Sequence, residues 1–222
     1  MTRLRLLIAA GGTGGHIFPA RAVAETLVQA GWQVRLVTDA RGLRHAHGFP
    51  GEGVDQIEAA TPLVKNPVRA AANLITIARG FAGAGRLIKS FRPDVIAGFG
   101  GYPAFPVLAH ARLAGIPYVI HEQNAVLGRV NRLFATKAVA VASGFDRLDR
   151  LPRAARHEVT GNPVRAAVLA GGAKPYAGKP GARPAGGRPG TRPFAGKPGG
   201  PRPAGGRPTG GRPSSGPRKP RG

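Results

Sequence analysis

The sequence contains no cysteine among its 222 residues. This absence excludes a disulfide scaffold, a zinc site built on cysteines and a cysteine nucleophile, and it fits a reducing compartment. Apolar runs are also short, and none approaches the ~18 residues that a membrane-spanning helix needs. The basic and apolar start over Arg3–Ala10 is similar to a signal peptide, but it leads directly into a glycine-rich turn. We therefore interpret it as the first strand of a cytoplasmic protein.

Acidic residues are scarce, with 10 Asp and Glu against 33 Lys and Arg, which gives a formal net charge of +23. Such a charge first suggests a nucleic-acid partner. Its distribution is uneven, however. Residues 171–222 contain 12 basic and no acidic residues, whereas residues 1–170 contain 21 basic and all 10 acidic residues, a net charge of +11. We therefore predict two parts, a domain over residues 1–170 and a tail over residues 171–222.

The tail has few side chains that can form a core. Gly and Pro occupy 28 of its 52 positions, and Tyr176 and Phe194 are its aromatic residues. Such a chain cannot bury enough apolar surface to offset the ~1–2 kcal/mol per residue lost when a backbone is ordered, so we predict disorder. Its basic residues would neutralise nucleic-acid phosphates, but stacking aromatics are nearly absent. We therefore interpret the tail as a solvent-exposed segment without a function of its own, and we expect no nucleic-acid partner.

Through residue 170, short apolar runs alternate with helical segments. The run Leu4–Ala9 is almost continuously apolar, which is typical of a strand buried on both faces of a sheet. Repeated strand–helix units predict an α/β fold with a parallel, Rossmann-like sheet, in which binding groups gather at the carboxyl ends of the strands. Strands are predicted at residues 4–9, 34–38, 54–57, 95–97, 118–120 and 138–141, and helices at 19–30, 67–91, 104–113 and 128–135.

The first predicted strand is followed by the glycine-rich segment Gly11-Gly12-Thr13-Gly14-Gly15-His16. Glycines let the backbone approach a ligand closely, and the next helix offers unpaired N–H groups to a phosphate. We therefore favour a phosphate or sugar-phosphate site. A dinucleotide site with Asp39 as the ribose-binding acid fits less well, because the third glycine of that fingerprint falls on Ile17. A tight turn without a ligand is the remaining alternative.

His16 directly follows these glycines. An imidazole with a pKa near ~6.5 is poised to act as a general base at neutral pH. The alternative is a histidine at a helix start that bonds a nearby backbone group. The residue type and its place next to the glycines therefore make His16 a candidate catalytic residue.

Two further polar segments follow later strands. Gly98-Phe99-Gly100-Gly101-Tyr102 places flexible backbone at the same edge of the sheet, either for a ligand or as a packing turn. His121-Glu122-Gln123-Asn124 puts four polar side chains at another strand end, where packing seldom needs them. We favour a binding site there, with Glu122 as a base or an acceptor of sugar hydroxyls and Asn124 as an amide contact.

Two segments are open to more than one interpretation. In Gly161-Asn162-Pro163-Val164-Arg165, Asn-Pro is a turn signal, while Arg165 is suited to a diphosphate. The long helix at 67–91 carries an apolar stripe among basic residues, which indicates either a core-facing helix or a surface that settles on an anionic membrane. A break in this helix at its glycines is also open. The stripe consists of Leu74, Ile77, Phe81 and Ile88, and the glycines are Gly80, Gly83 and Gly85.

Taken together, GGTGGH, FGGY, HEQN and GNPVR, in this order and at these strand ends, resemble the amino-terminal half of the MurG family. These are bacterial UDP-N-acetylglucosamine transferases that act on undecaprenyl-pyrophosphoryl-N-acetylmuramoyl-pentapeptide, known as lipid I. The resemblance covers roughly residues 3–170, and the ordered set of four motifs is highly specific. It implies the GT-B architecture of two Rossmann-like domains facing a cleft. It also implies conversion of lipid I to lipid II, with inversion at the anomeric carbon, by a peripheral enzyme at the cytoplasmic face of the cell membrane.

The resemblance implies roles for individual residues. Thr13, Gly14 and Gly15 would lie beside the diphosphate and sugar of the UDP-N-acetylglucosamine donor. Asn124 and Arg165 match further positions that contact this donor. No cofactor and no metal are implied.

The acceptor side of the reaction is implied in the same way. His16 and Glu122 match polar positions at the cleft, and either would help to deprotonate the acceptor hydroxyl, with His16 preferred. The matching motifs contribute further expected substrate-binding residues, namely Gly100, Gly101, Tyr102 and Gln123.

The sequence departs from the family after GNPVR. In the family a second domain follows and supplies most of the grip on uridine and ribose, whereas here the Gly- and Pro-rich tail follows. Because transfer depends on holding donor and acceptor in attack geometry, we expect the chain alone to bind lipid pyrophosphate and the anionic membrane surface. Catalysis would need a donor-binding domain. A frame-shifted or truncated gene and a split enzyme with a separate donor subunit are both open.

Overall fold

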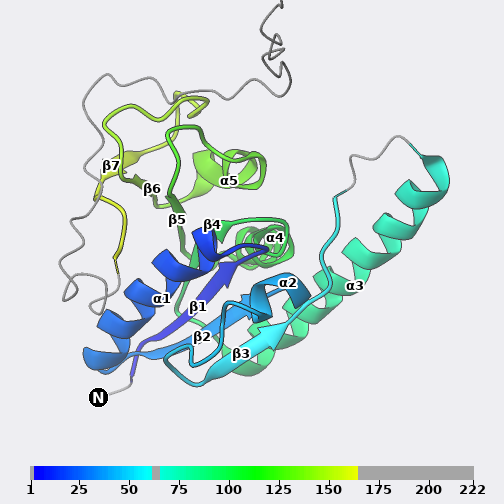
Figure 1. Cartoon of the computed structure of the whole chain (residues 1–222), viewed down its shortest axis with the longest axis horizontal. Helices are drawn as coiled ribbons and strands as arrows, with labels where there is room; N and C mark the ends of the chain where they lie inside the picture. The colour runs from blue at the N-terminus through cyan, green and yellow to red at the C-terminus, as the bar shows by residue number, and fades with distance from the viewer. Residues whose placement is uncertain (1–2, 62–65, 165–222) are drawn as a thin grey trace, which may run out of the picture. The chain divides into compact units, whose positions relative to one another are not determined.

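The computed structural model describes residues 3–61 and 66–164 (Figure 1). Arg165 and the predicted tail, together with the predicted boundary after residue 170, lie outside the described residues. Within them, seven parallel strands form one sheet in the order β3-β2-β1-β4-β5-β6-β7. This arrangement confirms the predicted α/β, Rossmann-like class. The strands are β1 (Arg5–Ala10), β2 (Gln33–Thr38), β3 (Gly53–Gln56), β4 (Val95–Gly100), β5 (Tyr118–Glu122), β6 (Ala140–Ser143) and β7 (His157–Val159).

Helices cover both faces of this sheet, as the alternation along β1 demonstrates. Leu6 and Ile8 pack in one apolar cluster with Ala20 of a helix, whereas Leu7 packs in a second cluster with Ala84 of another. Successive side chains of a strand point to opposite faces, so a continuously apolar strand needs a helix on each side. The helices are α1 (Gly14–Gln29), α2 (Ala40–Leu43), α3 (Pro67–Phe91), α4 (Ala104–Ala114) and α5 (Arg129–Phe134), with a 3₁₀ turn at Ala135–Lys137.

The order of winding changes between β1 and β4. From β1 the chain continues outward to β2 and β3, then returns to place β4 on the other side of β1. The segments that follow these two strands meet, and the backbone N–H of Gly11 donates a hydrogen bond to the carbonyl oxygen of Gly100 at 3.1 Å. In open parallel sheets, ligands bind at such a switch point, outside the carboxyl ends of the strands.

Several predicted boundaries were wrong. α1 begins at Gly14 rather than Pro19, so His16 lies in its first turn. β4 reaches Gly100, and β5 reaches Glu122 because these strands pair further along their neighbours than their apolar runs indicate. β6 is shifted toward the carboxyl end of the predicted run at 138–141, and α2, β7 and the 3₁₀ turn were not predicted. Short elements and polar strand ends carry little periodic signal, which explains these differences.

α3 is one continuous helix, so the break at its glycines that the sequence left open does not occur. These glycines are contact points. A Cβ on Gly80 would lie 2.0 Å from the carbonyl oxygen of Glu58, and one on Gly85 would lie 2.8 Å from the His110 ring of α4. That ring stacks on Phe81 with 3.8 Å between ring centroids. The glycines therefore let α3 approach its neighbours closely.

Only the second half of α3 faces the core, so the core-facing interpretation of its apolar stripe is correct for part of the helix. Its buried residues are Gly80, Ala84, Ile88 and Phe91, all in the second half of the helix. Leu74, which the stripe placed in the core, is 60% exposed. The first half of α3 therefore carries apolar side chains that this domain does not bury.

Candidate functional site

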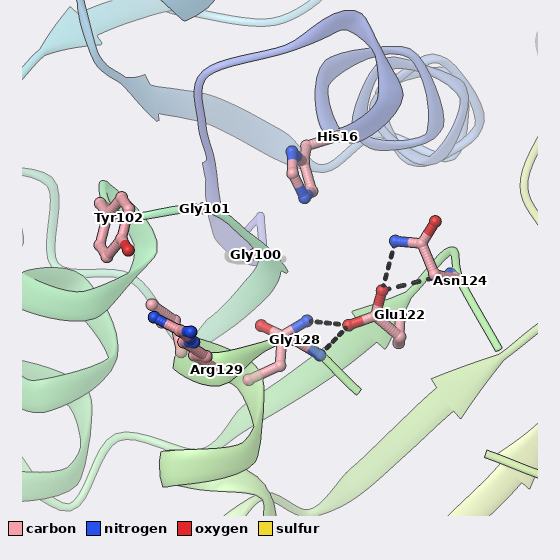
Figure 2. A pocket seen from close by; sticks show the side chains of 10 residues that line it. His16, Gly100, Gly101, Tyr102, Glu122, Asn124, Gly128 and Arg129 are labelled. Carbon is pink, nitrogen blue, oxygen red and sulfur yellow. Dashed lines mark hydrogen bonds between the residues drawn. The ribbon is translucent and has the colours of Figure 1, made fainter. Parts of the chain in front are cut away.

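Three of the predicted motifs meet at the switch point, around a pocket of about 170 Å³ (Figure 2). They meet because β1, β4 and β5 are adjacent strands whose carboxyl ends lie at one edge of the sheet. The structure brings six of the predicted site residues together in the lining of this pocket, namely His16, Gly100, Gly101, Tyr102, Glu122 and Asn124.

Gly100 and Gly101 shape the pocket because neither position tolerates a side chain. Their φ angles are +93° and +80°, in the left-handed region that favours glycine. A Cβ on Gly100 would lie 3.3 Å from Nε2 of His16 and 3.2 Å from Nδ2 of Asn131. A Cβ on Gly101 would lie 3.0 Å from the carbonyl oxygen of Gly11. The absence of a side chain at Gly100 leaves room for His16 and Asn131. The absence of a side chain at Gly101 lets this turn lie against Gly11 of the first glycine-rich turn.

His16 projects from the first turn of α1 toward the Gly100 turn (Figure 2). Its Nδ1 lies 3.2 Å from the hydroxyl oxygen of Thr13. When Nδ1 carries the proton and donates to this hydroxyl, Nε2 keeps a free lone pair on the side of Gly100. The geometry therefore suits a general base whose orientation is set by Thr13.

Glu122 is the acidic group of the pocket, and it is only 2% exposed. Its Oε1 accepts hydrogen bonds from the backbone N–H and the Nδ2 of Asn124, at 3.2 and 2.9 Å. Its Oε2 accepts from the backbone N–H of Gly128 at 2.9 Å and from Nδ2 of Asn131 at 3.0 Å. These four bonds stabilise a buried carboxylate and fix the segment between β5 and α5 (Figure 2).

His121 and Gln123 connect HEQN with the predicted GNPVR turn, and they are not in the pocket lining. The Gln123 amide donates to Nδ1 of His121 at 3.1 Å, so Nε2 carries the proton that is donated to the Gly161 carbonyl at 3.2 Å. The ring also stacks on Phe99. Burial lowers the pKa of His121 below its usual value. Asn162 donates to the backbone carbonyl of Gln123 at 3.2 Å, so the turn is tied to the end of β5.

Three predicted residues of the glycine-rich segment lie beside the pocket. Thr13 precedes α1 and its side chain does not cap the helix, while Gly14 and Gly15 form the first turn. A helix start without a side-chain cap presents N–H groups that suit an anionic ligand. Arg165, the remaining predicted residue, lies outside the described residues.

Asp39, which the dinucleotide alternative assigned to ribose, has partners within the protein. Its carboxylate accepts from the backbone N–H of Gly12 at 3.1 Å and of Gly42 at 2.8 Å. The Arg41 guanidinium lies 3.2 Å from it. Asp39 thus caps α2 and supports the first glycine turn, which disfavours a dinucleotide site.

Sequence reasoning missed four pocket residues at the start of α5: Gly128, Arg129, Val130 and Asn131. A signal for them was present. A helix was predicted from residue 128, directly after HEQN, and the start of that helix faces the same edge of the sheet. The order of strands, which sequence does not reveal, brings this helix start beside the turns of β1 and β4.

The described residues give little indication of a metal site, a serine nucleophile or a membrane-spanning helix. No group of three or more His, Asp and Glu side chains within residues 3–61 and 66–164 is arranged to hold a metal ion. Ser143 Oγ lies 2.8 Å from Nε2 of His157, but Ser143 is fully buried and its hydroxyl also bonds the carbonyl of Phe145. No helix in these two ranges combines the length and the apolar character that crossing a membrane requires.

Comparison with known proteins identifies relatives of this domain. Residues 6–143 match the glycosyltransferase family 28 N-terminal domain. Two similar proteins, from Maricaulis maris and Allorhizobium ampelinum, are both named UDP-N-acetylglucosamine–N-acetylmuramyl-(pentapeptide) pyrophosphoryl-undecaprenol N-acetylglucosamine transferase. The first is 65% identical over 172 residues, which is 77% of this chain and 47% of that protein. The second is 48% identical over 180 residues, 79% of this chain and 47% of that protein.

The crystal structure of Acinetobacter baumannii MurG is similar in fold, with a TM-score of 0.61 and 33% identity. The similarity covers 72% of this chain and 46% of that one. The chain thus spans about half the length of the curated relatives that it matches. The match over residues 6–143 and these relatives confirm the resemblance predicted from the four motifs: the chain belongs to glycosyltransferase family 28, and it corresponds to the amino-terminal domain of MurG-type members.

Proposed function

We propose that this chain is the acceptor-binding half of a transferase that moves N-acetylglucosamine from UDP-N-acetylglucosamine to lipid I, forming lipid II for peptidoglycan. The names of the relatives support this substrate pair. The observation that carries the proposal is the position of His16 and the glycine turns around one pocket at the switch point. In this proposal the described domain binds the acceptor and contacts the donor diphosphate, and a donor-binding domain supplies most of the grip on uridine and ribose that the reaction needs.

His16 is the general base in this mechanism. Nε2 takes the proton from the acceptor hydroxyl as its oxygen attacks the anomeric carbon of the donor, and UDP leaves from the opposite face with inversion. Thr13 orients the ring through Nδ1. Glu122 is the positioning residue, because both of its oxygens already accept hydrogen bonds from the segment between β5 and α5.

The donor diphosphate lies beside Thr13, Gly14 and Gly15 in this proposal. An uncapped helix start and backbone free of side chains allow close approach of phosphate oxygens. Asn124 and Arg165 contribute further donor contacts. Gly100, Gly101 and Tyr102 bound the acceptor on the opposite side of His16.

The membrane surface is a further partner in this proposal. Val68, Leu74 and Ile75 in the first half of α3 are 77%, 60% and 57% exposed, and Arg69 and Arg79 on the same helix are also exposed. Apolar side chains among arginines favour insertion at an anionic lipid surface. The chain would thus sit peripherally at the cytoplasmic face, where lipid I is presented.

Transfer should be restored by a donor domain supplied in trans. The full chain, a separately produced donor-binding domain, UDP-N-acetylglucosamine and lipid I are mixed, and lipid II is measured by chromatography. We expect His16→Ala to lower the rate by about 10²–10⁴-fold, the usual contribution of a general base. His47→Ala, which removes an exposed histidine away from the pocket, serves as the control. Absence of lipid II with the wild-type chain and an active donor domain would contradict the catalytic proposal.

A further inference from the structure

The start of α5 supplies two polar side chains to the pocket that none of the four motifs contains. Arg129 is exposed and Asn131 is 1% exposed, and both line the pocket. The helix start itself has no free N–H to offer at Gly128, because that group donates to Glu122. The polar side chains that the start of α5 contributes to the pocket are therefore Arg129 and Asn131.

Asn131 contributes an acceptor that lacks a partner. Its Nδ2 lies 3.0 Å from Oε2 of Glu122 and 3.4 Å from the carbonyl of His121. Both of these groups only accept hydrogen bonds, so the nitrogen of the amide is identified and the other atom is Oδ1. Among the described residues, Oδ1 is buried and has no hydrogen-bond partner. A buried acceptor without a partner is costly, which indicates that a ligand or water supplies the donor.

Arg129 contributes a free positive charge. Among the ion pairs of residues 3–61 and 66–164, none includes Arg129. The one carboxylate of the pocket, Glu122, is engaged by four N–H groups. Figure 2 places Arg129 near Tyr102, on the side of the pocket away from Asn124. The guanidinium is therefore available to an anionic group of the ligand.

We propose that α5 recognises a sugar phosphate, with Arg129 binding the phosphate and Oδ1 of Asn131 accepting a hydrogen bond from a hydroxyl or amide N–H of the attached sugar. Guanidinium groups bind phosphate oxygens through two parallel hydrogen bonds. This inference rests on the proposed function and assigns the two residues to the acceptor. The donor contains the same chemistry, so the experiment distinguishes the two sources.

The test measures binding by the full chain in isothermal titration calorimetry. The first probe is a water-soluble, short-chain analogue of lipid I, and the second is UDP-N-acetylglucosamine. We expect Arg129→Gln to weaken binding of the first probe by about tenfold or more, as for loss of one charge-assisted hydrogen bond, and to leave binding of the second unchanged. Arg129→Lys keeps the charge without the planar fork and should fall between the two.

Arg132→Gln is the matched control, because Arg132 is an exposed arginine of the same helix outside the pocket lining. If Arg129→Gln is no weaker than this control, the assignment of Arg129 is overturned. A loss confined to UDP-N-acetylglucosamine would also overturn it, since the cation would then serve the donor. If the wild-type chain binds no lipid I analogue at low salt, acceptor binding itself fails and this inference fails with it.

A third probe, the same short-chain lipid pyrophosphate without the sugar, tests Asn131. The wild-type chain should bind it more weakly than the complete analogue. In Asn131→Ala this difference should shrink, because the sugar has lost its acceptor. An unchanged difference in a folded Asn131→Ala variant would overturn the role of Asn131, and the Arg129 measurements stand independently of whether that variant folds.

Discussion

At the scale of single residues, the pocket depends on backbone conformations that only glycine adopts easily. Gly100 combines a positive φ with two side chains close to where its Cβ would be. Gly115, at the end of α4, has a φ of +68° but no atom within 4 Å of its Cβ position. Substitution of Gly115 therefore tests backbone strain alone, whereas substitution of Gly100 tests backbone strain together with crowding of the pocket.

Substituting each of these glycines should give different results. Gly100→Ala and Gly115→Ala should each lower the free energy of unfolding by about 1–2 kcal/mol, because a left-handed conformation is strained for alanine. Only Gly100→Ala should also weaken binding of the lipid I analogue, since its methyl group would crowd His16 and Asn131 in the pocket. Urea unfolding and calorimetry measure the two effects. Unimpaired binding by Gly100→Ala would show that the pocket is not the acceptor site.

His121 predicts a dependence of stability on pH. Burial lowers its pKa in the folded state, while the unfolded chain binds a proton near pH ~6.5. Below that value the unfolded state takes up more protons, so the free energy of unfolding should fall as the pH falls, by at most ~1.4 kcal/mol per pH unit. His121→Gln should flatten this slope between pH 7 and 5. His47→Gln corrects for removing an exposed imidazole, and equal slopes for His121→Gln and wild type would refute the argument.

At the scale of elements, α3 illustrates glycines with opposite roles on one helix. The Cβ position of Gly80 lies 2.0 Å from the backbone carbonyl oxygen of Glu58, whereas the nearest atom to that of Gly83 is 3.5 Å away. Backbone cannot move aside as a side chain can, so Gly80 is required for packing. Gly83 has room for a methyl group.

We expect alanine to stabilise the domain at Gly83 and to destabilise it at Gly80. Gly83→Ala should raise the free energy of unfolding by about 0.5–1 kcal/mol, because alanine favours a helix more than glycine does. Gly80→Ala should lower it by about 1–3 kcal/mol through overpacking. Denaturant titration of both variants measures this difference. Equal effects of the same sign would mean that α3 does not rest on the segment after β3.

The elements were predicted where one pattern dominated and were missed where packing decided. Val34–Thr38 and Ala104–Leu113 were predicted within a residue or so of β2 and α4, because their patterns are periodic and flanked by turn residues. The glycines of α3 suggested a break because glycine disfavours a helix. Their packing role could not be predicted, because the residues they contact, Glu58 and His110, are distant in sequence. Asn131 was missed for a similar reason: its partner Glu122 belongs to another element.

At the scale of the whole molecule, the charge of +23 has a different interpretation from the one that composition first suggests. Under the proposed function, the expected anions are lipid pyrophosphate, a nucleotide sugar and an anionic membrane. Basic residues attract such a surface from solution, and exposed apolar residues of α3 would then insert. Charge and apolar contact should therefore be separable in a binding experiment.

Sedimentation with lipid vesicles can separate them. The chain should bind vesicles rich in anionic lipid and dissociate as salt is raised, with weak binding to zwitterionic vesicles. A Leu74→Gln, Ile75→Gln double variant should bind anionic vesicles severalfold more weakly at unchanged charge, because each loses an exposed apolar side chain. Val159→Gln, an exposed residue on β7, is the control. Equal binding by the double variant and the control would exclude α3 as the lipid-facing element.

The hydrogen bond between Gly11 and Gly100 has a consequence for the order of folding. As the chain is synthesised, β1 and β2 emerge early and can pair at once, but the other neighbour of β1 begins only at Val95. The pocket closes later still, when Asn131 has been added. The segments that pack against the first glycine turn are therefore synthesised late. Pairing between segments so distant in sequence is also slow, so this turn is completed only near the end of domain synthesis. A nascent chain stalled before α5 would thus have most strands of its sheet but would lack the side of the pocket that α5 contributes.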